Sequence, residues 1–147
     1  VLTDQRRSTT AEQVLGALTP VAAALVNLQL GPRREDLAAW RGQPVCDLMD
    51  HVADMADTAA LIEGLDLIIS VDTSVVHLAG ALGKPVWLIS RWDGCWRWGD
   101  TGETSPWYPT MRIFRAQERT LGPVLEQVGA ALQAWVATWQ PGKGALD

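Results

Sequence analysis

The apolar positions of this chain fall into two patterns, short apolar runs and helical spacings. The runs from Leu67 to Val71 and from Val86 to Ile89 are typical of parallel strands covered on both faces. A spacing of three and four residues near the end of the chain predicts a last helix that Pro141-Gly142 terminates. Its apolar residues are Leu121, Leu125, Val128, Leu132, Trp135 and Trp139.

The same reasoning predicts the other elements. Helices are expected over residues 10–18, 33–40, 54–64 and 74–82, and strands over residues 24–30, 45–48 and 111–114. Thr9 with Glu12, or Thr10 with Gln13, has the spacing of a capping box at the first helix. Since strands alternate with helices, we expect an α/β fold, a three-layer Rossmann-like domain with a mostly parallel sheet.

The stretch 91–110 follows neither pattern. It combines several tryptophans with glycines, prolines and charges, and a loop of this length in a compact domain is often functional.

Composition narrows the class of protein. A chain of 147 residues with 48% hydrophobic residues suits one globular domain over residues 1–147. The net charge of −5 argues against a general nucleic-acid binder. No apolar run approaches the roughly 20 residues of a membrane span, and no signal peptide is visible. Cys46 and Cys95 fit no metal or redox pattern, so we expect reduced thiols and a cytoplasmic protein. Because the chain begins at Val1 with residues that look like a strand end, we expect it to be part of a longer protein.

The turn Asp72-Thr73-Ser74 and the following His77 are the strongest candidates for chemistry. They lie between a predicted strand and a predicted helix, and a helix N-terminus offers unpaired N–H groups and partial positive charge to a phosphate. Thr73, Ser74 and His77 share one face of the first turn. Helix capping by Asp72 or Thr73 is the plainer interpretation of the same residues. A carboxylate repels phosphate, so we expect Asp72 to order the turn through backbone N–H groups, with a sugar hydroxyl as its alternative partner.

Two further polar residues end predicted strands. Gln29 and Arg91 could meet Asp72 at the carboxyl edge of the sheet, where ligands of such folds bind. Gln29 would contact a ribose or base, and Arg91 a phosphate. Lys84 lies at the far end of the helix and is expected to favour a helix C-terminus instead. No cluster of histidines and cysteines suggests a metal site.

The segment DTSVVHLAGALGKPVW resembles the signature of glycosyltransferase family 9, the heptosyltransferase-like enzymes. The segments LQLG, ADTAALIEGLDLIISVD, CWRW and SPWYPTMRIFR are similar to the branch often fused to tetratricopeptide repeats. The resemblance runs from about Arg6 to Arg115. Many of these enzymes have glycine where this chain has Ser74, a difference that could tighten the phosphate pocket or change the choice of donor.

The resemblance implies a two-domain, metal-independent glycosyltransferase of GT-B type. This chain resembles its C-terminal half, which holds most of the nucleotide-sugar donor site and uses no cofactor. The N-terminal acceptor half, with the usual catalytic base, is expected to lie outside the chain. By resemblance, Arg6 or Arg7 reaches the donor phosphates, and His77 stabilises the charge of the departing diphosphate.

The sequence thus predicts a nucleotide-sugar donor-binding domain that is inactive or nearly so without its other half. Two alternatives stay open. One is a non-catalytic nucleotide-binding module. The other is a protein-interaction domain with a vestigial anion site, whose tryptophan-rich surface docks a protein partner. The aromatic residues of 91–110 could stack on a base or sugar, but we expect most of them to cover the sheet edge or to face the missing half, where two copies could pair as a homodimer.

Overall fold

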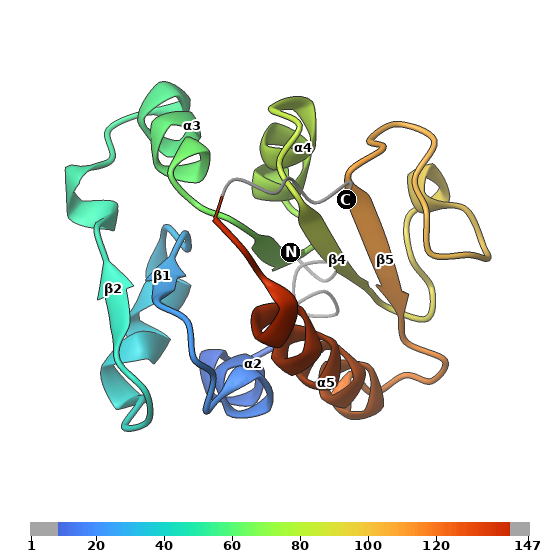
Figure 1. The fold of residues 1–147 in the computed structure, drawn as a ribbon, viewed down its shortest axis with the longest axis horizontal. Coiled ribbons are helices and arrows are strands. Elements are labelled where there is room, and N and C mark those ends of the chain that lie inside the picture. Colours follow the sequence, from blue (N-terminus) through green and yellow to red (C-terminus); the bar gives the residue numbers. More distant parts are fainter. Residues whose placement is uncertain (1–8, 142–147) are drawn as a thin grey trace.

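The computed structural model describes residues 9–141, without the side chains of Pro32 and Arg33. Helices and strands alternate along the chain (Figure 1). The elements are α2 (Ala11–Leu18), β1 (Leu25–Asn27), η1 (Pro32–Ala39), β2 (Val45–Asp47), η2 (Met49–His51), α3 (Met55–Glu63), β3 (Ile68–Val71), α4 (Ser74–Ala81), β4 (Val86–Ser90), η3 (Trp96–Trp98), β5 (Met111–Arg115) and α5 (Gly122–Thr138), where η marks a 3₁₀ helix.

All strand pairings between named strands are parallel, as expected, but they form two groups rather than one sheet. β3, β4 and β5 form a three-stranded sheet in that order, with Val71 opposite Ile89 and Ser90 opposite Arg115. β1 and β2 pair only with each other. We call these the three-stranded unit (β3–β5 with α4) and the two-stranded unit (β1 and β2 with η1 and η2).

The three layers follow from the alternation of side chains along β4. Trp87 and Ile89 pack into one hydrophobic cluster with residues of α5 and α2, while Val86 and Leu88 pack into a second cluster with residues of α3 and α4. Figure 1 accordingly shows α3 and α4 on one side of the strands and α2 and α5 on the other. Because both faces are buried, every residue of β4 is buried, which explains its continuous apolar sequence.

The helix ends match the sequence signals. Of the two possible capping boxes, the one formed is Thr10 with Gln13, in which the Gln13 amide donates to the Thr10 hydroxyl at 3.2 Å. The carboxylate of Asp54 accepts from the Asp57 amide at the start of α3. Gly83 has a φ of 71° and begins the turn after α4, where the Lys84 amide donates to the Ala79 carbonyl. The Lys84 ammonium donates to the Leu65 carbonyl, just past the end of α3, so it lies away from the start of α4 as expected.

The connection from β4 to β5 contains no α-helix, although a helix usually joins parallel strands. Arg115 holds this connection in place, because its guanidinium donates to the carbonyls of Gly99, Gly102, Trp98 and Thr101. The amide of Ile113 donates to the Glu103 carbonyl, so the connection also covers the outer edge of β5.

Two smaller expectations concern the cysteines and membrane-spanning helices. Both cysteines are free thiols, with Cys46 exposed and Cys95 partly buried. Within residues 9–141, no helix is both long and apolar enough to cross a membrane.

Candidate functional site

The start of α4 carries no side-chain cap. Thr73 occupies the N-cap position with an extended backbone, but its hydroxyl makes no capping hydrogen bond and lies 3.3 Å from the Ser70 hydroxyl. No side chain in the described range accepts from the amides of Ser74 and Val75. Neither Asp72 nor Thr73 therefore forms the side-chain capping hydrogen bond that the plainer interpretation expects. The exposed Thr73 and Ser74 flank free N–H groups that can receive an anion.

Three side chains surround His77, one turn into α4. Its Nδ1 lies 3.0 Å from the Tyr108 hydroxyl, and its Nε2 lies 3.8 Å from a carboxylate oxygen of Asp72. The imidazole also stacks on the indole of Trp98, with ring centres 5.2 Å apart and planes 25° from parallel. The His77 side chain remains 35% exposed, so its ring is both fixed and open to solvent.

Asp72 differs from the expectation in its partner. Across the described residues its carboxylate accepts no backbone hydrogen bond and instead faces the imidazole of His77. Thr73 rather than Asp72 takes the N-cap position, so the Asp72 carboxylate lies one residue before the cap of α4.

Arg91 reaches the same edge of the sheet as this turn. Val71 of β3 is paired with Ile89 of β4, so Asp72 and Arg91 both leave the sheet just beyond paired residues. The Arg91 Nε forms an ion pair with Asp93 at 2.7 Å. Its Nη1 is buried and has no hydrogen-bond partner in the described chain, which leaves one donor unused at this edge.

The remaining expected residues are not joined to this group. Gln29 is exposed beyond the end of β1, where its backbone amide donates to the side-chain oxygen of Asn27 at 2.8 Å and its side-chain amide donates to the Leu30 carbonyl at 3.4 Å. β1 has no pairing to β3, and no hydrogen bond in residues 9–141 links Gln29 to Asp72 or Arg91. Arg6 and Arg7 lie outside the described residues.

The structure divides the aromatic residues of 91–110 into two sets. Trp98 is buried in the cluster beneath α4, and Tyr108 packs against the same cluster. Trp92, Trp96 and Trp107 are exposed, with Trp96 the most exposed at 75%. Sequence reasoning treated all of these residues alike and missed the contact of Tyr108 with His77. The two positions are 31 residues apart, so no local periodicity could have indicated their contact.

Comparison with known proteins gives the family. The sequence model of glycosyltransferase family 9 (heptosyltransferase) matches residues 51–127. The chain belongs to glycosyltransferase family 9. A relative, Protein FlbA of Caulobacter vibrioides, is 32% identical in an alignment of 120 residues that covers 77% of this chain. The aligned part is 20% of FlbA, so the chain spans about a fifth of the length of that relative. No solved structure matches significantly.

The part of this family 9 chain that matches the family model contains α4, the connection 91–110 and β5. It therefore includes the Asp72–His77 turn, Arg91 and Tyr108, whereas Gln29 lies before it. The residues that the structure brings together are thus those of the family segment.

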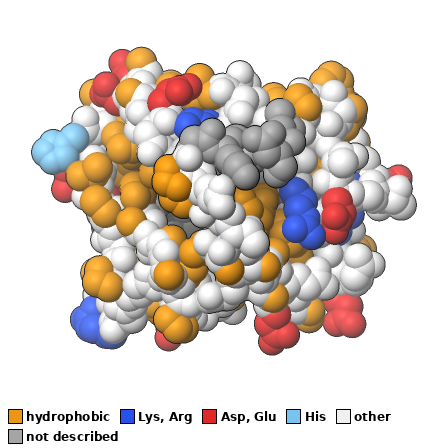
Figure 2. Space-filling view, viewed as in Figure 1, with side chains coloured by type: hydrophobic (Ala, Val, Ile, Leu, Met, Phe, Trp, Pro, Cys, Tyr) orange, Lys and Arg blue, Asp and Glu red, His pale blue; other side chains and the backbone are white. Residues whose placement is uncertain are grey.

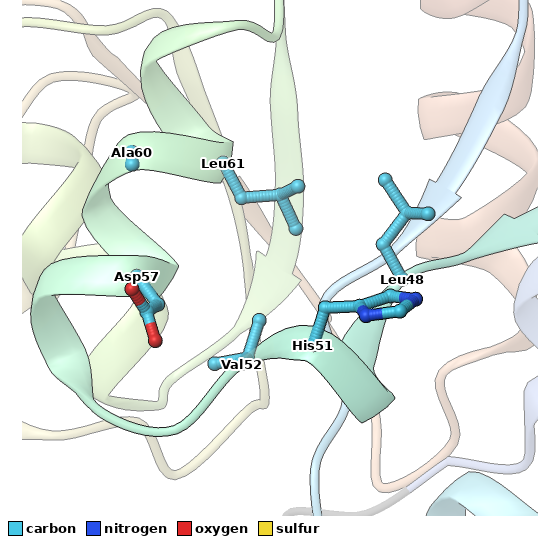
Figure 3. Close-up of a pocket in the computed structure, with 6 residues that line it drawn as sticks. All are labelled: Leu48, His51, Val52, Asp57, Ala60 and Leu61. Atoms are coloured by element: carbon cyan, nitrogen blue, oxygen red, sulfur yellow. The ribbon is translucent and has the colours of Figure 1, made fainter.

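A separate pocket of about 460 Å³ lies between η2 and α3. Figure 3 shows Leu61 of α3 pointing across it toward Leu48 and His51. Its lining residues do not include those around His77, so it is not the space above the start of α4. The described residues hold no group of three His, Cys, Asp or Glu side chains arranged for a metal ion.

Proposed function

We propose that this chain is the nucleotide-sugar donor-binding domain of a glycosyltransferase. The observation that carries the proposal is the uncapped start of α4 with His77 beside it. Family 9 membership supports a sugar-transfer reaction. The proposed substrate is a nucleoside-diphosphate sugar, with the reaction taking place in the cytoplasm.

The diphosphate would lie over the first turn of α4. The free amides there and the positive end of the helix dipole attract an anion, and the hydroxyls of Thr73 and Ser74 add two donors. The unused Nη1 of Arg91 lies at the same edge and would add positive charge. Gln29 and Arg6 remain proposed contacts of the ribose or base and of the phosphates, respectively.

In the proposed reaction, the acceptor hydroxyl attacks the anomeric carbon of the donor sugar. The bond from that carbon to the diphosphate oxygen breaks, and the diphosphate departs with the bonding electrons. His77 donates a hydrogen bond to the departing diphosphate, which stabilises the charge that builds there. The acceptor proton passes to a base that we place in a separate acceptor domain of the full-length protein.

Calorimetric titration with UDP, ADP, GDP and their sugar conjugates tests the proposal. We expect one nucleotide to bind selectively, and His77→Ala to weaken it about tenfold, the loss expected for one hydrogen bond to a charged group. Gln127→Ala, an exposed substitution on α5 at the other face of the sheet, is the control and should leave affinity unchanged.

Equal affinity of the His77→Ala variant and the wild type would contradict the proposed role of His77. Absence of binding to any nucleotide, both by this chain and by the full-length protein, would contradict a donor domain. That result would favour the interaction domain, for which the 75% exposure of Trp96 is the supporting observation. Figure 2 shows that further hydrophobic side chains are exposed on one face of the molecule, between dispersed charges. Binding without any discrimination of the sugar would favour the non-catalytic nucleotide module.

A further inference from the structure

Tyr108 is the part of the 91–110 connection that reaches the proposed anion site. Its hydroxyl makes the 3.0 Å contact with Nδ1 of His77, and its ring meets the imidazole edge-on. We infer that Tyr108 is a positioning residue that fixes the orientation and the tautomer of His77. The inference rests on the proposed role of His77 in donor binding, and it assigns to the tryptophan-rich connection a role in building that site.

The tyrosine is itself held from three sides. Its backbone amide donates to the buried Ser105 hydroxyl at 3.3 Å. Its ring lies against Gly80 of α4 so closely that a Cβ at residue 80 would come within 2.6 Å of the ring. On the remaining side its ring centre is 6.4 Å from that of Trp98. The hydroxyl is therefore presented to His77 by a fixed ring rather than by a mobile loop side chain.

The surrounding groups select one tautomer of the neutral imidazole. Nε2 faces the carboxylate of Asp72, which attracts an N–H and repels a lone pair. With the proton on Nε2, Nδ1 is an acceptor, and the Tyr108 O–H donates to it. The opposite tautomer would place a lone pair against the carboxylate. Asp72 and Tyr108 thus favour the same arrangement from the two ends of the ring.

This arrangement leaves a donor for the ligand. The 3.8 Å between Nε2 and Asp72 exceeds a hydrogen-bond distance, so the Nε2–H is attracted to the carboxylate but not bound by it. An oxygen of a nucleoside diphosphate can then accept from Nε2. Loss of the tyrosine hydroxyl would free Nδ1 to take the proton, which removes the donor from Nε2.

The direct test is ¹⁵N NMR of ring-labelled histidine at about pH 8, where imidazoles are neutral. The chain contains two histidines, so the exposed His51 provides an internal reference. We expect His77 to show a protonated Nε2 and an unprotonated Nδ1 in the wild type. Tyr108→Phe should convert it to a mixture of tautomers and leave His51 unchanged. Trp107→Phe is the matched control. It removes the indole N–H that donates a hydrogen bond to the Arg97 carbonyl in the same connection, but keeps the Tyr108 hydroxyl.

The same variants are titrated with the nucleotide that the wild type binds. We expect Tyr108→Phe to weaken binding about fivefold, as for one lost hydrogen bond, and Trp107→Phe to leave it unchanged. An unchanged His77 tautomer in Tyr108→Phe overturns the inference, and so does a changed tautomer with unchanged affinity. If neither the wild-type chain nor the full-length protein binds a nucleotide, the proposed donor function fails and the ligand role of Tyr108 fails with it. The NMR spectra still decide separately whether Tyr108 sets the tautomer.

Discussion

The two strand groups of this domain are stabilised by different forces. In the three-stranded unit, β4 is buried along its whole length, and apolar clusters fill both faces of the sheet. In the two-stranded unit, β1 is half-buried and most of β2 is exposed. Polar contacts connect its elements, with Arg34 bridging Asp47 and Asp50 at 2.6 Å each.

The comparison explains where the candidate site lies. A site that must hold an imidazole in one orientation needs a rigid support, and the buried cluster of the three-stranded unit provides it through Trp98. Gln29 belongs to the two-stranded unit, whose strands have no comparable core. The difference between the units can be tested by substitutions, which follow in order of expected effect.

Leu88→Ala should cause the largest loss. Leu88 is fully buried in the middle of β4, and removing such a side chain leaves a cavity that costs about 3 kcal/mol. The matched change in the two-stranded unit is Val45→Ala, at the one half-buried residue of β2, where we expect a loss of about 1 kcal/mol. Urea unfolding measures both changes. Equal losses would show that the two units have equally important apolar cores.

Gly129→Ala should have the next largest effect, because Gly129 is where α5 touches α2. A Cβ at this residue would lie 2.2 Å from the Ala17 carbonyl oxygen, so the helices must separate at a cost of about 2 kcal/mol. Gly16→Ala is the control within α2, since no atom lies within 4 Å of its Cβ position. It should stabilise the protein by up to about 1 kcal/mol through helix propensity. Thermal unfolding of both variants would show opposite shifts, and shifts of the same sign would contradict the close contact.

Arg34→Gln should have the smallest effect on stability at neutral pH, because the ion pairs that Arg34 forms are partly exposed. Its effect should instead depend on pH. Partial burial raises the pKa of the Asp47 carboxyl, but hydrogen bonds from Arg34 and Asn27 outweigh this effect and hold the pKa below its usual range. The hydrogen bond from Arg34 likewise lowers the pKa of Asp50.

The sign of the pH dependence follows from these lowered values. The contribution of both carboxylates to the free energy of unfolding is complete above their unfolded-state pKa of about 3.9. It is lost as the pH falls through their lower folded-state pKa values. Wild-type stability should therefore decline below about pH 4, and Arg34→Gln should decline less. Unfolding midpoints measured between neutral and acidic pH check this, and parallel curves for the two proteins would contradict it.

Much of the fold could be predicted from local sequence. The run from Val86 to Ile89 indicated a strand covered on both faces, and the spacing from Leu121 to Trp139 indicated α5. The separation of β1 and β2 from the other strands could not be predicted, because apolar runs do not specify which strands pair. The choice of Thr10 over Thr9 as cap also depended on the backbone at the helix start.

The candidate site was predicted where its residues are close in sequence and missed where they are not. Thr73, Ser74 and His77 share one turn, so helical spacing sufficed to group them. The contact from Tyr108 depends on an irregular connection held by Arg115, and neither residue shows a periodic pattern. The role of Asp72 as a neighbour of His77, rather than of its own turn, likewise required the structure.

The close approach of Tyr108 to Gly80 has a consequence for evolution. Glycine inside a helix is less stable than alanine by about 1 kcal/mol, yet the tyrosine ring occupies the volume that a methyl group at residue 80 would need. The two positions should therefore vary together among relatives, with a side chain at 80 appearing only where 108 has lost its aromatic ring. A lineage that acquired alanine at 80 would be expected to orient the histidine by another route.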